Sequence, residues 1–157
     1  MQTEGGSSSI KFSKYHGIGN DFILVDNRSA LDPLVSAAAA ASLCDRHTGV
    51  GADGLIMLMT SSNCNSNSAS ASGSEVASKS KVGDYTMKIF NGDGSEPEMC
   101  GNGIRCLAQF IKDIGAPIAD DRVAIDTLAG LREISFLADG DIQVSDGYLN
   151  SSNQSVT

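Results

Sequence analysis

Apolar residues along this chain occur mainly in short runs, and polar or glycine-rich turns separate the runs. Residues 21–26 hold the run FILV, GLIMLM follows from Gly54, and DYTMKIF spans 84–90. Nearer the C-terminus, VAIDT and LREISFL predict a hairpin, and DIQVS predicts one more strand. We therefore expect a domain in which strands outnumber helices.

Two segments have the features of helices. LDPLVSAAAAASLCDRH (31–47) is rich in alanine, with Asp32 as the expected cap and Pro33 in the first turn. A second helix is predicted by apolar residues at helical spacing, namely Ile104, Leu107, Phe110, Ile111 and Ile114. Because most connections are short, we expect an α+β fold in which a mostly antiparallel or mixed sheet wraps on a central helix.

Composition narrows the functional classes. The 157 residues are 41% hydrophobic and 19% charged, enough for one domain with a core. A net charge of −8 argues against nucleic acid or an anionic membrane surface as the main partner. No apolar run approaches the roughly 18 residues that span a bilayer. We expect a soluble intracellular protein with free thiols, because four cysteines are few for a disulfide scaffold of this length.

Residues 61–82 differ in character from the rest of the chain. Nine of these 22 residues are serine and the apolar pattern stops, so we interpret the segment as a disordered insertion between two strands. Cys64 within it should be exposed. Residues 1–10 and 146–157 also lack apolar periodicity, and we expect a flexible tail and a divergent tail, respectively.

The stretch FNGDGSEPEMCGNGIRC (90–106) carries the most suggestive chemistry. It places Cys100 immediately before the second predicted helix. There, unpaired backbone N–H groups and the helix dipole stabilise a thiolate and can also hold a carboxylate. Gly101 and Gly103 flank Asn102 and let a ligand approach the backbone closely. A base beside an anion-binding turn is suited to removing a proton from a carbon next to a carboxylate.

Two asparagines elsewhere have a similar setting. Asn20 lies in HGIGND just ahead of a strand, and Asn91 lies where another strand ends in a tight turn. Side-chain amides carry both donors and an acceptor, so they can pair with the ammonium and the carboxylate of an amino acid. From the residues alone, Cys100 is equally well interpreted as a functional or a structural thiol.

Competing interpretations of these motifs are weaker. The glycine-rich stretches complete neither a nucleotide-binding nor a calcium-binding loop. The cysteines lack the paired spacing of a zinc site, so we expect no metal. Cys44 and Cys106 fall within helix patterns and are predicted to be buried apolar residues.

Three blocks of sequence carry a resemblance to a known family. FSKYHGIGNDFILVD, LCDRHTGVGADGLI and MKIFNGDGSEPEMCGNGIRC resemble, in this order, the N-terminal half of the diaminopimelate epimerases. The residues of these blocks are most similar to the plant, algal or cyanobacterial-like branch of the family. The resemblance covers about residues 11–140, and it makes residues 11–145 an N-terminal diaminopimelate epimerase-like domain.

The resemblance implies a reaction and roles for particular residues. The family interconverts LL- and meso-diaminopimelate in lysine biosynthesis by proton transfer between two cysteines, without pyridoxal phosphate, metal or other cofactor. Cys100 matches the cysteine that acts as base. Asn20, Asn91, Gly101 and Asn102 match substrate-binding positions, and Gly54 stands where some members have a glutamine.

The family fold also implies a second, similar half, which the sequence does not contain. The opposite cysteine is expected in a turn like A-C-G-T-G, and no such turn is present. We therefore expect a truncated or partial epimerase that pairs with a complementary half or forms a homodimer. The alternatives are a non-catalytic half-domain that serves as an interaction or assembly module, or a related proline racemase-like isomerase. The expected location is the chloroplast stroma for a plant or algal protein, and otherwise the cytoplasm.

Overall fold

The computed structural model describes residues 9–61 and 83–146. The strands in this part are β1 (Ser13–Gly17), β2 (Asn20–Asp26), β3 (Gly54–Thr60), β4 (Tyr85–Asn91), β5 (Arg122–Thr127), β6 (Gly130–Phe136) and β7 (Ile142–Asp146). The helices are α1 (Ala37–Cys44) and α2 (Gly101–Asp113). The predictions for the two tails and for the serine-rich insertion with Cys64 concern residues that lie wholly or mostly outside the described ranges.

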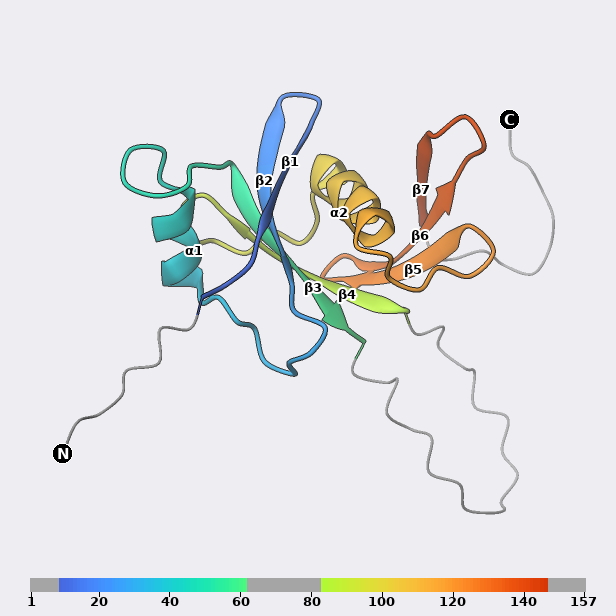
Figure 1. Cartoon of the computed structure of the whole chain (residues 1–157), viewed down its shortest axis with the longest axis horizontal. Helices are drawn as coiled ribbons and strands as arrows, with labels where there is room; N and C mark the ends of the chain where they lie inside the picture. The colour runs from blue at the N-terminus through green and yellow to red at the C-terminus, as the bar shows by residue number, and fades with distance from the viewer. Residues whose placement is uncertain (1–8, 62–82, 147–157) are drawn as a thin grey trace, which may run out of the picture.

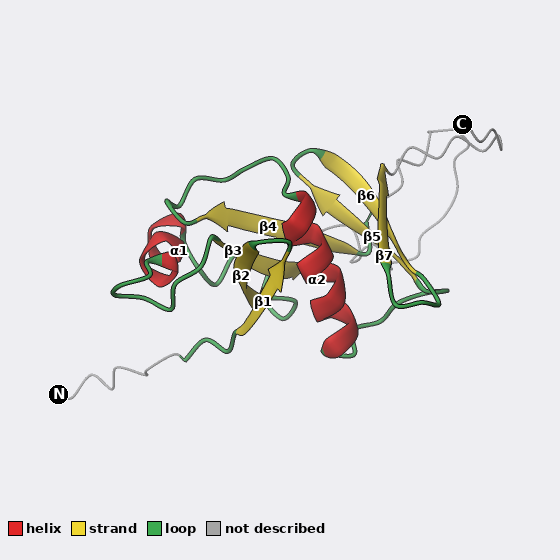
Figure 2. Cartoon of the chain, turned by 90° about the horizontal axis from the view of Figure 1, so that it is seen from above, coloured by secondary structure: helices red, strands yellow, loops and turns green. Residues whose placement is uncertain are grey.

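The described strands form one sheet in the order β1 to β7 (Figure 1). Neighbouring strands pair antiparallel, except that β2 with β3 and β4 with β5 are parallel. The sheet curls around α2, which lies between the β1–β4 part and the β5–β7 part when seen from above (Figure 2). The predicted α+β class, with a mixed sheet wrapped on a central helix, is confirmed.

The helix α2 is central because one of its faces is apolar and buried. Ile104, Leu107 and Ile111 are completely buried. They belong to a core that also contains Leu24 of β2 and Ile125 of β5, so one helix face joins both parts of the sheet. Neither described helix is long and apolar enough to cross a membrane.

A second core covers the opposite face of β2, β3 and β4. Residues of α1 pack there against residues of the strands. The members of this core include Ala40 and Cys44 of α1, Ile23 and Val25 of β2, and Leu55 and Met57 of β3. Because helices cover both faces of β2 and β3, the apolar runs in these strands are continuous instead of alternating. This double burial explains why the sequence predicted both strands so clearly.

The helix α1 begins later than predicted. Ser36, not Asp32, is the N-cap, and its Oγ accepts a hydrogen bond from the backbone N–H of Ala39 at 3.3 Å. The preceding loop is organised by the buried Asn27, whose amide donates to the carbonyl of Asp32 at 3.0 Å. The Asn27 oxygen also accepts from the backbone N–H of Leu34 at 2.7 Å. These bonds hold the segment as a loop, so the prediction of Asp32 as the cap was wrong.

The sequence did not predict β1, whose residues alternate between half-buried and exposed. A two-residue turn joins β1 to β2, and Ile18 and Gly19 in this turn both have positive φ, 47° and 89°. This is the backbone geometry of a tight hairpin, although it is strained for a β-branched residue. The hairpin draws Asn20 and Asp21 into β2, so they lie inside the strand and not ahead of it.

We predict that the buried face of α2 contributes much more to the stability of the fold than its exposed face. Leu107→Ala should lower the free energy of unfolding by about 2–5 kcal/mol, because it removes fully buried methyl groups. Arg105→Ala, on the exposed side of the same helix, should change it by less than about 0.5 kcal/mol. Urea unfolding of both variants measures the difference, and equal effects would show that α2 is not the core of this fold.

Candidate active site

The predicted site residues of the strands lie at one end of the sheet. Asn20 is the first residue of β2, and Gly54 is the first residue of the parallel strand β3. Asn91 is the last residue of β4, which runs antiparallel to β3, and it pairs directly with Gly54. Strand direction therefore gathers these residues at one edge, although they are far apart in the sequence.

The helix α2 starts at the same end of the sheet. The side-chain Nδ2 of Asn102 donates a hydrogen bond to Oδ1 of Asn20 at 2.8 Å. This bond connects two motifs 82 residues apart and sets the first turn of α2 beside the start of β2. Cys100 and Gly101 precede Asn102 in this turn, so the structure brings four of the five predicted site residues together.

Cys100 occupies the N-cap of α2, immediately before the helix as the sequence predicted. Its backbone is extended (φ −135°, ψ 113°), and its Sγ accepts a hydrogen bond from the backbone N–H of Gly103 at 3.4 Å. The side chain is half-buried. A methyl group on Gly101 would meet no described atom within 4 Å, so the turn is open on that side. The N–H groups of Gly101 and Asn102 lie in the first turn, where a helix offers them no acceptor.

Asn91 is held by the turn that ends β4. Its Nδ2 donates to Ser95 Oγ at 2.9 Å, and its backbone N–H donates to the carbonyl of Ser95 at 2.8 Å. Hydrogen bonds from the Ser95 hydroxyl, and then from the Ser95 backbone N–H at 2.8 Å, keep the pKa of the Asp93 carboxylate below its usual value. The structure thus places Asn91 at the same end of the sheet, with its amide engaged inside its own turn.

The segment between this turn and Cys100 is fixed to the sheet at two further points. Lys88 of β4 forms an ion pair with Glu96 at 2.5 Å. The carbonyl of Glu98 accepts a hydrogen bond from the backbone N–H of Ala129, in the turn between β5 and β6, at 3.1 Å. These contacts define the path of the chain into Cys100.

A charged network beside Asn20 was missed by the sequence analysis. The Asp21 carboxylate accepts from Arg46 at 2.6 Å and from Lys14 at 2.8 Å. Arg46 also donates to Asp53 at 2.9 Å, and Asp53 accepts from the Asn20 amide at 3.3 Å. No local pattern announces these contacts, because the residues come from four separate segments.

Comparison with known proteins gives the chain its family. The model of the family described as diaminopimelate epimerase matches residues 12–150. The chain belongs to the diaminopimelate epimerase family. This family consists of isomerases, and the resemblance seen in the three sequence blocks is confirmed.

Individual relatives place the chain near cyanobacterial members of the family. It is 47% identical to a diaminopimelate epimerase of Synechocystis sp. over 139 residues, and 49% identical to one of Rippkaea orientalis over 140 residues. Each match covers 88% of this chain but 43% of the relative. The chain therefore spans less than half the length of the curated relatives that it matches.

A solved structure supports the fold. A Bacillus anthracis phenazine biosynthesis protein of the PhzF family superposes with a TM-score of 0.51 at 18% identity. The match covers 86% of this chain and 38% of that protein. At this identity the likeness concerns the fold alone.

The three cysteines in the described part of this family member have different environments. Cys44 and Cys106 are 3% and 4% exposed, and burial raises the pKa of both thiols. They were predicted to be buried apolar residues, and this is confirmed. Cys100 is the more accessible of the three. In residues 9–61 and 83–146, no group of three or more histidine, cysteine or acidic side chains is arranged to hold a metal ion.

We predict that Cys100 is the thiol of the described region that reacts with solvent reagents. In a Cys64→Ser background, iodoacetamide should modify Cys100 in the native protein while Cys44 and Cys106 stay unmodified, because burial shields these two and keeps them protonated. Peptide mass spectrometry after a timed reaction identifies the sites, and the same reaction in denaturant should modify all three. Modification of Cys106 as early as Cys100 would contradict the assigned environments.

We also predict that the stabilising effect of Asp21 depends on pH. Hydrogen bonds from Arg46, and then from Lys14, hold the pKa of Asp21 well below its usual range. A depressed native pKa stabilises the fold above the unfolded value of about 4, and this stabilisation is lost as the pH falls further. Asp21→Asn should therefore lower the urea midpoint at pH 7, and the difference from wild type should shrink between about pH 4 and pH 2.

The matched control for this experiment is Asp32→Asn, which changes an exposed carboxylate outside the network. It should leave the urea midpoint nearly unchanged at both pH values. A pH-independent deficit in Asp21→Asn would show that the network acts through shape and not through charge.

Proposed function

We propose that this chain carries the cysteine-bearing, substrate-binding half of a diaminopimelate epimerase, which interconverts LL- and meso-diaminopimelate in lysine biosynthesis. The observation that supports this most directly is the Asn102–Asn20 hydrogen bond, because it sets the turn that follows Cys100 beside a second polar motif. Relatives named diaminopimelate epimerase supply the substrate class. Their names also favour this substrate over that of a proline racemase-like isomerase.

Substrate binding follows from the groups at the start of α2. One carboxylate of the substrate would lie on the N–H groups of Gly101 and Asn102, where the helix dipole favours negative charge. Asn20 and Asn102 would bind the remaining polar groups near the stereocentre through their amides, and Asn91 would contribute the part of its amide that does not bond Ser95. The open side of Gly101 supports this placement, since nothing described blocks access there.

The chemical step assigned to this half is removal of the α-proton. Cys100 acts as the thiolate base, and the N–H of Gly103 stabilises the negative sulfur. The α-proton of an amino acid is weakly acidic, so the developing carbanion needs fixed dipoles close to its carboxylate. The first turn of α2 supplies them, and the proposed reaction uses neither pyridoxal phosphate nor a metal.

Inversion requires an acid on the opposite face of the α-carbon. We propose that a complementary half supplies it, because Cys100 is the thiol that the described part of this chain offers at the site. A homodimer would instead place two copies of the same turn around the substrate. The location proposed with this function is the chloroplast stroma in a plant or alga, and otherwise the cytoplasm.

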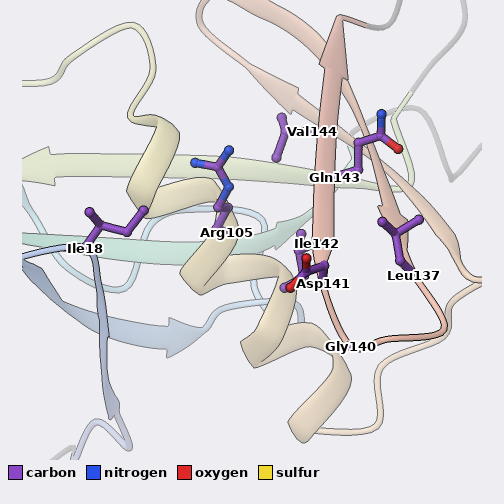
Figure 3. A pocket seen from close by; sticks show the side chains of 8 residues that line it. All are labelled: Ile18, Arg105, Leu137, Gly140, Asp141, Ile142, Gln143 and Val144. Carbon is purple, nitrogen blue, oxygen red and sulfur yellow. The ribbon is translucent and has the colours of Figure 1, made fainter.

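A hollowed face beside Cys100 fits the complementary half. One hollow of about 390 Å³ is lined by Met99, Gly101 and Arg105 of the α2 region together with residues of β6 and β7. A larger hollow of about 730 Å³ lies between Ile18, Arg105 and the β6–β7 hairpin (Figure 3). Leu137 on its rim is 43% exposed. Exposed apolar groups around a concave surface are typical of an interface, which supports coverage by a further part of an epimerase.

We predict that this chain exchanges the substrate α-proton without inverting it. Incubation with LL-diaminopimelate in deuterated water should give slow α-deuteration by one thiolate and no meso product. Addition of a polypeptide that supplies the rest of the Synechocystis relative should restore meso-diaminopimelate. Nuclear magnetic resonance follows deuteration, and chiral chromatography follows the stereochemistry.

Two variants control this experiment. Cys100→Ala should lower exchange by at least about 100-fold, the usual size of a general-base contribution, while Cys64→Ser should leave it unchanged. Inversion by the chain alone would reveal a second acid within it. If the complemented mixture gives neither deuteration nor product, and light scattering shows an inert monomer, the proposal fails.

A further inference from the structure

Asp53, the residue before β3, has a contact pattern that the proposed reaction does not use. Its Oδ2 accepts hydrogen bonds from the backbone N–H of Asp21 at 3.0 Å and from Nδ2 of Asn20 at 3.3 Å. Its Oδ1 accepts from Arg46 at 2.9 Å. The carboxylate is thus held from two sides, and one of its oxygens faces the amide of a candidate substrate-binding residue.

An ionised carboxylate can only accept hydrogen bonds, and this determines the orientation of its neighbours. The side of the Asn20 amide that faces Asp53 must be the NH₂ group. The Asn20 oxygen therefore faces Asn102, which must respond with its own NH₂ group, as the 2.8 Å bond shows. One carboxylate in this way fixes the orientation of two successive amides.

The fixed orientation decides which groups a ligand meets. Each amide uses one N–H in this relay and keeps a second one as a donor. The oxygen of Asn102 accepts no hydrogen bond from the described residues, so it remains an acceptor. An amino acid carries both a carboxylate and an ammonium. The remaining N–H donors of the oriented amide pair can bond the carboxylate, and the Asn102 oxygen can accept from the ammonium.

The acceptor oxygen of Asp53 matters more in this arrangement than its charge. Arg46 is 54% exposed, and an ion pair with an exposed arginine contributes little free energy. Asparagine has the same shape as aspartate and can keep an oxygen toward Asp21 and Asn20; its NH₂ group then loses the bond from the exposed Arg46, which keeps its bonds to Asp21. Loss of the acceptor, in contrast, leaves the Asn20 amide without a partner that selects its orientation.

We propose that Asp53 is a positioning residue that sets the donor and acceptor orientation of the Asn20–Asn102 amide pair. Its effect on ligand affinity rests on the proposed function, whereas its effect on the two amides does not. The two can therefore be tested separately in the full chain.

The first test reads the amides of the free protein. In nitrogen-15 spectra, Asp53→Ala should shift the side-chain NH₂ signals of both Asn20 and Asn102, although Asp53 bonds directly only to the first of these two amides. Asp53→Asn should leave these signals close to wild type. The matched control is Asp26→Ala, which removes the carboxylate that pairs with Arg28 at the other end of β2 and should shift neither amide. Unchanged Asn102 signals in Asp53→Ala would overturn the proposal.

The second test reads ligand binding, with LL-diaminopimelate as the probe. Asp53→Ala should weaken binding about five-fold, the usual effect of one net hydrogen bond, and Asp53→Asn should stay within about two-fold of wild type. In an Asn20→Ala background, Asp53→Ala should cause no further loss of affinity, because Asp53 acts on the ligand through its hydrogen bond to Asn20. A merely structural role would give additive losses and would overturn the proposal.

The two tests distinguish failure of the inference from failure of the proposed function. If the wild-type chain binds no diaminopimelate but the amides respond to Asp53→Ala as described, the positioning role holds and the substrate assignment falls. If the ligand binds, and Asp53→Asn and Asp53→Ala have the same effect on binding and on the amide signals, the substrate assignment holds and the positioning role falls.

Discussion

The close packing of the first turn of α2 on the sheet is the constraint on which this site depends. A methyl group at Gly103 would lie 3.0 Å from Cδ1 of Ile56 in β3, so glycine lets the helix come this near without displacing the Ile56 side chain. The buried apolar face that follows, from Ile104 onwards, then keeps the helix in place. Because the helix starts at this end of the sheet, its first turn lies beside the start of β2, where Asn102 contacts Asn20.

Polar contacts convert this placement into a defined arrangement of groups. The bond between Asn102 and Asn20 ties helix to sheet, and the carboxylates of Asp21 and Asp53 surround the start of β2. The partners of these carboxylates are partly exposed, so the network contributes more to orientation than to stability. The apolar core thus fixes the relative positions of the helix and the strands, whereas the polar residues at the start of β2 orient the amides.

Membership in the diaminopimelate epimerase family gives this arrangement its chemical meaning. The chain matches about 43% of the length of its cyanobacterial relatives, and this part contains a half-buried thiol at a helix N-terminus and asparagine amides beside it. The hollowed face between α2 and the β6–β7 hairpin lies next to the turn that carries the thiol. The proposed reaction, which needs groups on both faces of one carbon, is compatible with this open arrangement.

Local sequence determined most of the elements of this protein and the position of Cys100 at the start of α2. The apolar runs of β2 and β3, the helical spacing after residue 103 and the cysteine before it are short-range patterns, and each was read correctly. The tertiary structure alone decided which polar groups meet. The contacts of Asn20 with Asp53 and Asn102 span 33 and 82 residues, and the loop bonds of Asn27 moved the cap of α1 from Asp32 to Ser36. The physical reason is that periodicity records only the burial of each residue, whereas a hydrogen bond between distant segments depends on strand register and helix position, which the whole core sets.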